Sequence, residues 1–194
     1  MILPIIAYGD AVLRRKTWPV PPDYPELDAL IENMFETMYN APGVGLAAPQ
    51  IGLSLRLFVV DLSPFANDDK LTEAEQEEFR NFKKVFINPG MISETGEKWK
   101  FNEGCLSIPD IREDISRNDT ICIEYYDERF TKHTETFHGL AARVIQHEYD
   151  HLEGILFTDK LSALRKRMIK GKLADISKGK IEVDYKMRFP NSKR

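Results

Sequence analysis

Apolar residues recur at intervals of three and four in two stretches of the chain, and this spacing predicts amphipathic helices that each bury one face. The stretches are residues 26–39 and residues 161–176. Their apolar positions are Leu27, Leu30, Ile31, Met34, Phe35 and Met38 in the first, and Leu161, Leu164, Met168, Leu173 and Ile176 in the second. Between them, residues 141–151 open with the run Ala-Ala-Arg-Val-Ile, which favours a third helix.

Continuous or alternating apolar runs predict the strands. Residues 55–62 and 85–89 are mainly apolar, which is typical of buried strands. Residues 120–125 alternate between apolar and polar side chains, as a half-buried strand does, and residues 134–137 are its expected partner. The pattern therefore predicts strands on both sides of a polar segment and a strand pair shortly before the middle helix.

The polar segment between the first two strands, residues 63–84, is expected to be a solvated insert. Within it, residues 71–79 are acidic and are predicted to form a short surface helix capped by Thr72. After the second strand, residues 91–101 are expected to be extended, with a turn at residues 95–97.

Length and charge add one asymmetry to this picture. The 194 residues suit one domain, or one domain with an appendage, and are enough to bury a hydrophobic core. The net charge of −4 hides a division: residues 160–194 hold 12 basic and 3 acidic residues, so they carry +9 and the rest of the chain carries −13. No internal repeat or low-complexity tract is present.

Cysteine content and the absence of targeting signals predict a cytoplasmic protein. Cys105 and Cys122 are the two cysteines, and so low a count fits a reducing compartment. The first ten residues have no basic n-region and meet proline and charge too early for a signal peptide. No apolar run approaches membrane-spanning length, so no membrane contact is expected.

The middle helix carries the first candidate chemistry. His147 and His151 stand four residues apart, and because an α-helix turns once in about 3.6 residues, their rings share one face and can bind one metal ion. Glu148 follows the first histidine and can accept a proton from a water on that ion. The competing interpretation is a surface helix that carries two histidines by chance.

A catalytic metal site normally takes three protein ligands and leaves one position for water, so a third ligand is needed. Cys105 is the candidate, because a thiolate binds metals well and Gly104 frees the backbone to bend around an ion. Without the histidines, Cys105 would be interpreted as a small buried hydrophobic residue. Cys122 lies in a strand pattern and is expected in the core.

A loop of small residues, 41–50, follows the first helix and ends at Gln50. Gly43 and Gly45 allow a ligand to approach the backbone closely. The loop lacks the lysine and hydroxyl residue of a phosphate-binding P-loop. By itself it remains either a plain turn or a substrate-binding loop.

Three stretches, taken together, resemble a known family. They are Gly-Val-Gly-Leu-Ala-Ala-Pro-Gln at 43–50, Glu-Gly-Cys-Leu-Ser at 103–107 and Gln-His-Glu-Tyr-Asp-His-Leu-Glu-Gly at 146–154. In this order they resemble peptide deformylase, the family that removes the formyl group from the initiator methionine of new bacterial and organellar proteins. The resemblance runs from about Gly9 to Leu164. Departures lie in the acidic insert and after Lys180.

The resemblance implies an α+β fold, with short antiparallel sheets around a central metal-binding helix and a C-terminal helix. Residues 1–164 would form the catalytic deformylase-like domain, and residues 165–194 would form a basic C-terminal helix and tail. The predicted strands and helices agree with this layout. The implied partners are formyl-Met N-termini of nascent polypeptides and the ribosome, through the basic C-terminal segment. On charge alone, that segment remains open to the alternative of a solvated face that balances the acidic body. Neither DNA nor a membrane is expected as a partner.

The resemblance also implies a role for each candidate residue. Cys105, His147 and His151 would hold the metal, and Glu148, Gln50 and the Leu106 N–H would act in catalysis. Val44, Gly45, Leu140 and Val144 would contact the substrate. The donor types alone suit zinc, whereas the family points to one iron(II) ion, with zinc or nickel replacing it in preparations.

Two other functions remain as alternatives. A His-Glu-x-x-His metallopeptidase would take a downstream histidine or glutamate as third ligand, yet no histidine follows His151, and Glu153 or Glu182 would leave Cys105 and Gln50 without a role. A noncatalytic protein with a structural metal site would close that site with four protein ligands.

Overall fold

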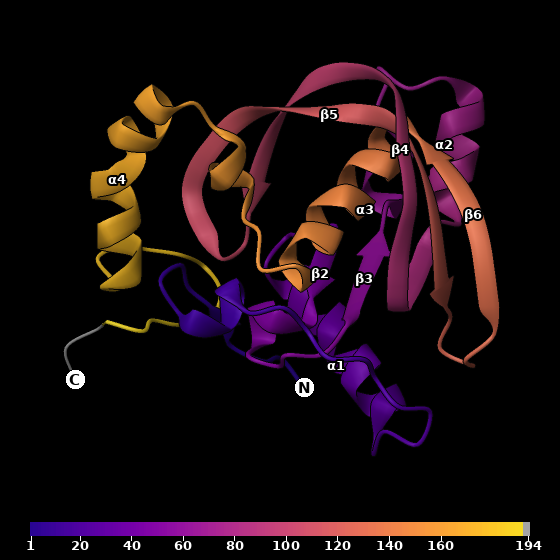
Figure 1. Cartoon of the computed structure of the whole chain (residues 1–194), viewed down its shortest axis with the longest axis horizontal. Helices are drawn as coiled ribbons and strands as arrows, with labels where there is room; N and C mark the ends of the chain where they lie inside the picture. The colour runs from indigo at the N-terminus through magenta and orange to yellow at the C-terminus, as the bar shows by residue number, and fades with distance from the viewer. Residues whose placement is uncertain (192–194) are drawn as a thin grey trace.

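Figure 1 shows the protein as a computed structural model, which describes residues 1–191. The helices are α1 (Leu27–Asn40), α2 (Glu73–Arg80), α3 (Gly139–Leu152) and α4 (Ala163–Ser177). The strands are β1 (Ile5–Ile6), β2 (Gly45–Ala47), β3 (Leu57–Asp61), β4 (Lys83–Cys105), β5 (Ile108–Tyr126), β6 (Lys132–His138) and β7 (Met187–Arg188). Short 3-10 helices η1 to η4 span Ala11–Arg14, Ala48–Ile51, Ser63–Phe65 and Phe157–Lys160.

A five-stranded antiparallel sheet in the order β2-β3-β4-β5-β6 curves around α3, which lies at the centre of the molecule (Figure 1). β4 and β5 form a long hairpin whose register shifts four times, and such bulges let a long strand bend. One shift lies between Thr95 and Lys98, where Gly96 takes a φ of +77°. The predicted turn at residues 95–97 is therefore wrong. β4 continues through these residues and contains a β-bulge there.

The core lies on both faces of this sheet. On one face, Phe58 and Phe86 of the sheet pack with Ile145 of α3, and all three are fully buried. On the other face, Met34 of α1 packs with Val59. Burial on both faces explains why residues 57–61 form an almost continuous apolar run.

The predicted fold class, α+β with a central helix and a C-terminal helix, is confirmed. The predicted helix at 26–39 corresponds to α1, and the predicted insert helix corresponds to α2, whose Thr72 hydroxyl accepts from the N–H of Glu75 at 3.3 Å. β4 and β5 are longer than the strands that the pattern predicts. β1 and β7 form an additional pair, which is parallel.

The C-terminal helix α4 buries Ile169, Leu173 and Ile176 in a third core cluster. Leu164 and Met168 were predicted on this buried face, and that prediction is wrong: their exposed fractions are 66% and 61%. Ile169 takes the inner position instead. The division into domains 1–164 and 165–194 stays a prediction, and position 165 lies inside α4.

Gly154 generates a stability prediction, because it ends the α3 segment with φ +72° and a Cβ there would lie 2.5 Å from the Arg14 carbonyl oxygen. We expect Gly154→Ala to lower the free energy of unfolding by at least about 1–2 kcal/mol, from the left-handed backbone alone. Urea unfolding followed by circular dichroism measures this change.

The matched control is Gly171→Ala, at an exposed position inside α4 with no atom within 4 Å of its Cβ. An alanine there should stabilise the protein by about 0.5–1 kcal/mol, because glycine weakens a helix interior. Equal effects of the two substitutions would contradict the close approach at Gly154.

Candidate metal centre

Helix α3 places His147 and His151 on one face, as their spacing predicts. The two ring centroids lie 5.2 Å apart. His151 is fully buried, whereas His147 retains a small exposed fraction toward the cavity described below. Because Ala142 and Ile145 of the same helix are packed in the core, the orientation of both imidazoles is set by the packing of the helix.

The candidate third ligand reaches the histidines from the β4–β5 hairpin. β4 ends at Cys105, which pairs with Ile108 across a two-residue turn. The Cys105 Sγ lies 3.3 Å from the Nε2 of His151, and the ligand atoms of Cys105, His147 and His151 all lie within 4.8 Å of one another. One thiolate and two imidazole nitrogens at these separations suit tetrahedral coordination of a divalent cation, with a fourth position for water.

The protonation of the two histidines differs. Burial opposes the charged form of His147, yet its hydrogen bonds to Cys105 and Glu103 raise its pKa to about 10. Burial and the nearby His147 lower the pKa of His151 well below its usual value. A cation bound by these nitrogens replaces the proton, so metal binding at this site is coupled to proton release.

A buried carboxylate, Glu103, orients His147. Its Oε2 lies 3.0 Å from the Nδ1 of His147, which places the proton of the neutral ring on Nδ1 and leaves Nε2 for the ion. Arg117 donates to both Glu103 oxygens, at 2.7 and 2.9 Å, and Arg143 donates at 2.9 Å. Although burial alone would raise it, hydrogen bonds from His147 and Arg117 hold the pKa of Glu103 well below its usual range.

Glu148 lies beside the ligands with one oxygen unsatisfied. The residue is 4% exposed, and its Oε2 has no hydrogen-bond partner among the residues described. Burial raises the pKa of Glu148 to about 7, which suits a group that accepts and returns a proton near neutral pH. A Cβ at Gly45 would lie 2.4 Å from the other oxygen, so a residue larger than glycine would displace this carboxylate.

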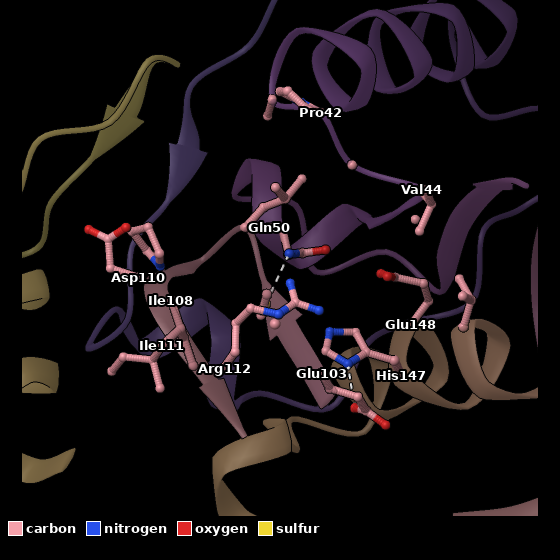
Figure 2. A pocket seen from close by; sticks show the side chains of 18 of the residues that line it. Pro42, Val44, Gln50, Glu103, Ile108, Asp110, Ile111, Arg112, His147 and Glu148 are labelled. Atoms are coloured by element: carbon pink, nitrogen blue, oxygen red, sulfur yellow. Dashed lines mark hydrogen bonds and ion pairs between the residues drawn. The ribbon is translucent and has the colours of Figure 1, made fainter. Parts of the chain in front are cut away.

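Gln50 faces the same space from η2. Its side-chain oxygen accepts from the N–H of Ala47 at 2.9 Å, which fixes the amide orientation. Its Nε2 then donates to the Ser107 hydroxyl at 3.3 Å and to the Cys105 sulfur at 3.5 Å. Figure 2 shows Gln50, His147 and Glu148 directed toward the same part of the cavity.

These groups open into a cavity of about 690 Å³. Every residue that was predicted to contact substrate lines it: Val44, Gly45, Leu140 and Val144. Leu106 and the catalytic candidates Gln50 and Glu148 line it as well. The structure therefore gathers around one cavity residues that come from the segment 44–50 (the start of β2 and η2), the β4–β5 hairpin and α3.

The chain matches known proteins along almost its whole length. The family model described as polypeptide deformylase matches residues 2–167. The chain belongs to the polypeptide deformylase family.

Its relatives include the peptide deformylase of Christiangramia forsetii, which is 66% identical over 194 residues covering 100% of this chain and 99% of that protein. The peptide deformylase of Flavobacterium johnsoniae is 57% identical over the same coverage. Among solved structures, a peptide deformylase from Legionella pneumophila matches with a TM-score of 0.77 and 38% identity, over 93% of this chain and 98% of that one.

Membership decides the activity. Deformylases are metal-dependent hydrolases that remove the N-formyl group from formyl-Met N-termini of nascent chains, and this chain is one of them. Neither alternative, a metallopeptidase or a protein with a structural metal, is favoured by these findings. Among residues 1–191, no helix is long and apolar enough to cross a membrane.

Sequence reasoning did not identify the residues that support the candidate metal ligands. Glu103 was noted as part of a motif, but its hydrogen bonds to Arg117, Arg143 and His147 were not predicted. Tyr185, whose hydroxyl donates to the Leu106 carbonyl at 2.8 Å, was also missed. No local spacing signals these partners, because they come from β5, α3 and the C-terminal segment.

Gly45 generates the prediction from this geometry. We expect Gly45→Ala to lower kcat at least about 100-fold, the usual contribution of general acid–base catalysis, because the added methyl group displaces Glu148. Bound metal should remain, since no candidate ligand is touched. Formate release and metal content measured on the same sample test this.

Gly90→Ala is the matched control. A Cβ at Gly90 in β4 would meet Glu124 at an ordinary 3.5 Å, away from the cavity. Its activity should stay near wild type. Full activity in Gly45→Ala would contradict the expectation that the added methyl group displaces a carboxylate needed for proton transfer.

Proposed function

We propose that Cys105, His147 and His151 hold one divalent ion and that Glu148 transfers the proton during deformylation. The observation that carries this proposal is the convergence of three ligand atoms beside the buried, unpartnered oxygen of Glu148. When bound, the ion lowers the pKa of a water and polarises the formyl carbonyl. Glu148 accepts a proton from the attacking water and then donates it to the departing amine.

Gln50 and Leu106 stabilise the negative charge that develops on the formyl oxygen. The hydrogen bond that the Gln50 side-chain oxygen accepts from Ala47 fixes the amide, so its Nε2, which donates to Ser107 and Cys105 in this structure, faces the developing charge. The N–H of Leu106 is the second donor. Val44, Leu140 and Val144 surround the methionine side chain, and Gly45 leaves room for the peptide beside Glu148.

The structure supports this assignment over the metallopeptidase alternative. Glu153 was one candidate downstream ligand, but it is bound by Arg56 at 2.6 Å and Lys16 at 3.0 Å. Glu182, the other candidate, is exposed on the cavity wall. The group of metal-ligating side chains found in residues 1–191 contains Cys105 and the two helix histidines alone, which also leaves a position open for water.

Substitutions distinguish the proposed proton-transfer residue from the proposed metal ligands. Glu148→Ala should keep the metal and lose at least about 100-fold in kcat, because it removes acid–base catalysis. His147→Ala and Cys105→Ala should lose metal as well as activity. Formate release from a formyl-Met peptide by anaerobically prepared protein, with metal analysis of each variant, tests both statements.

Glu103→Gln is a useful comparison, since it alters the partner of His147 without removing a ligand. Metal affinity should fall about 10- to 100-fold, as is typical when an outer partner of a ligand is changed. Metal loss in Glu148→Ala, or full metal content in Cys105→Ala, would remove that residue from its assigned role.

We propose iron(II) as the ion in the cell, with zinc or nickel taking its place in preparations. The proposal rests on the family, because the sulfur and two nitrogens of the site suit zinc equally well. We also propose a cytoplasmic location for the protein. The two free cysteines, Cys105 and Cys122, support it.

Oxygen sensitivity tests the ion. With iron(II) bound, activity should decay in air and faster with peroxide, because a thiolate beside a redox-active ion is open to oxidation. Nickel- or zinc-loaded protein should lose activity more slowly under the same conditions. Equal decay of the iron and nickel forms would contradict this account.

We also propose that α4 binds ribosomal RNA near the exit of the nascent chain. Lys166, Arg167 and Lys170 of this helix are exposed, and they lie among the exposed Leu164 and Met168. The competing interpretation is a solvated basic face that balances an acidic body. Arg165 is also exposed, but its guanidinium pairs with Glu113 at 2.6 Å, so its charge is partly neutralised by the body of the protein.

The corresponding prediction concerns the exposed basic side chains of α4, which can contact RNA phosphates. Reversal of Lys166, Arg167 and Lys170 to glutamate should reduce cosedimentation with ribosomes at low salt, while turnover of a short formyl peptide stays near wild type. Wild-type binding should fall steeply as salt rises, because phosphate contacts release counterions.

A control variant makes the same change of net charge by replacing Lys70, Lys98 and Arg129 with glutamate. These exposed residues lie in the loop before α2, in β4 and in the β5–β6 turn. Its cosedimentation should stay near wild type. Loss of binding in both variants would indicate a general charge effect, and no loss in either would leave α4 as a solvated face.

A further inference from the structure

The first and last strands of the described chain form a small sheet of their own. β1 and β7 pair in parallel, and the N–H groups of Ile5 and Ala7 donate to the carbonyls of Lys186 and Arg188, each at 2.9 Å. Figure 1 shows the C-terminal segment, in yellow, running back from α4 to reach the N-terminal segment, in indigo. The two ends of the described chain are therefore held together.

Both strands of this small sheet lead to a contact with the turn between β4 and β5. Just after β1, the N–H of Tyr8 donates to the Ser107 carbonyl at 2.8 Å. Just before β7, the Tyr185 hydroxyl donates to the Leu106 carbonyl, also at 2.8 Å. Two consecutive carbonyls of the turn thus accept hydrogen bonds from opposite ends of the chain. We call this pair of hydrogen bonds the terminal clamp.

The turn that the terminal clamp contacts carries groups with proposed roles in the reaction. Cys105, a candidate metal ligand, ends β4, and the Leu106 N–H is the proposed second donor to the formyl oxygen. The Ser107 hydroxyl accepts from the Gln50 amide at 3.3 Å. Because the turn has only two residues between the paired Cys105 and Ile108, a shift of the Leu106 carbonyl also moves the adjacent Leu106 N–H.

Tyr185, the side chain in the terminal clamp, stands on a segment that is itself fixed. β7 begins two residues later, and beyond it the N–H of Asn191 donates to the carbonyl of Ser177, the last residue of α4, at 3.0 Å. The Tyr185 ring is half-buried and packs in the same core cluster as Leu106. Burial raises the pKa of Tyr185, so its hydroxyl stays protonated and remains a donor.

We propose that Tyr185 is a positioning residue for deformylation, whose hydroxyl holds the β4–β5 turn so that the Leu106 N–H faces the negative charge that develops on the formyl oxygen. This inference rests on the proposed role of the Leu106 N–H. A donor that is in place before charge appears stabilises that charge without a cost of reorganisation. Tyr185 acts through the Leu106 peptide and not on the reacting atoms.

Tyr185→Phe tests the inference, because it removes the hydroxyl and keeps the ring in the core cluster. In metal-loaded full-length protein, kcat for a formyl-Met peptide should fall about tenfold, the effect of losing one ordinary hydrogen bond. KM and bound metal should stay near wild type. The loss should remain below the roughly 100-fold expected when a donor to the oxyanion is removed outright, because the Leu106 N–H is still present.

A second measurement reports the position of the turn without any turnover. It uses NMR relaxation of zinc-loaded protein, since zinc has no unpaired electrons. The order parameter of the Leu106 N–H should be about 0.85 in wild type, as in rigid backbone, and should fall toward about 0.6 in Tyr185→Phe. Order parameters along α3 should not change.

Tyr125→Phe is the matched control. Tyr125 of β5 is also buried and donates its hydroxyl, to Glu135 at 2.9 Å, but it lies outside the cavity. Urea unfolding should show a similar loss of stability in both variants, because each loses one hydrogen bond of the same kind. In Tyr125→Phe, kcat and the Leu106 order parameter should stay near wild type.

The outcomes separate this inference from the proposed role of Leu106. An unchanged order parameter in Tyr185→Phe would show that the hydroxyl does not hold the turn, and the role of Leu106 would stand. A lower order parameter with unchanged kcat would remove the Leu106 N–H from oxyanion stabilisation, and the inference would fail with it. A loss confined to KM, or an equal loss of kcat in Tyr125→Phe, would also overturn the inference, since it would indicate substrate binding or stability alone.

Discussion

A buried carboxylate, Glu103, links the fold to the candidate metal site. It accepts hydrogen bonds from Arg117 on β5 and from Arg143 and His147 on α3, so the long hairpin and the central helix meet at one group. Arg117 also donates to Asp150 of α3 at 2.7 Å. Removing one partner from such a buried network costs about 3–5 kcal/mol, because the remaining charge is left unpaired. The orientation of His147 is thus fixed by contacts that also hold the fold together.

The second constraint is space. Helix α3 and strand β2 approach so closely that the Glu148 carboxylate fits only because position 45 has no side chain. The same helix buries Ala141, Ala142 and Ile145 in the main core, so it has no freedom to move away. Burial by this packing raises the pKa of Glu148, and its oxygen without a hydrogen-bond partner among the described residues suits proton transfer.

The C-terminal segment divides its charge between two surfaces. Basic side chains of α4 face outward, while Ile169, Leu173 and Ile176 pack the helix onto the body. Beyond α4 the chain places Glu182 and Asp184 at the cavity and ends its described part beside β1. A segment with a strong net positive charge therefore also contributes two carboxylates to the lining of the cavity.

The sequence by itself determined the features that depend on local spacing and residue type. The period of α1, the cap of α2 at Thr72 and the pairing of His147 with His151 are all set within a few turns of helix. Cys105 was predicted as the third ligand because a glycine precedes it and, unlike Cys122, it lies outside a strand pattern, and the structure places its sulfur beside both histidines.

Tertiary structure alone decided the contacts between distant segments. The periodicity of α4 predicted a helix, but which face is buried depends on what the helix meets, so Leu164 and Met168 were misplaced and Ile169 was not identified. The partners of Glu103 depend on the register of β4 against β5, and the bulge at Gly96 shifts that register. Tyr185 reaches Leu106 from 79 positions away. Such contacts follow from packing and strand register, which no local pattern of residues encodes.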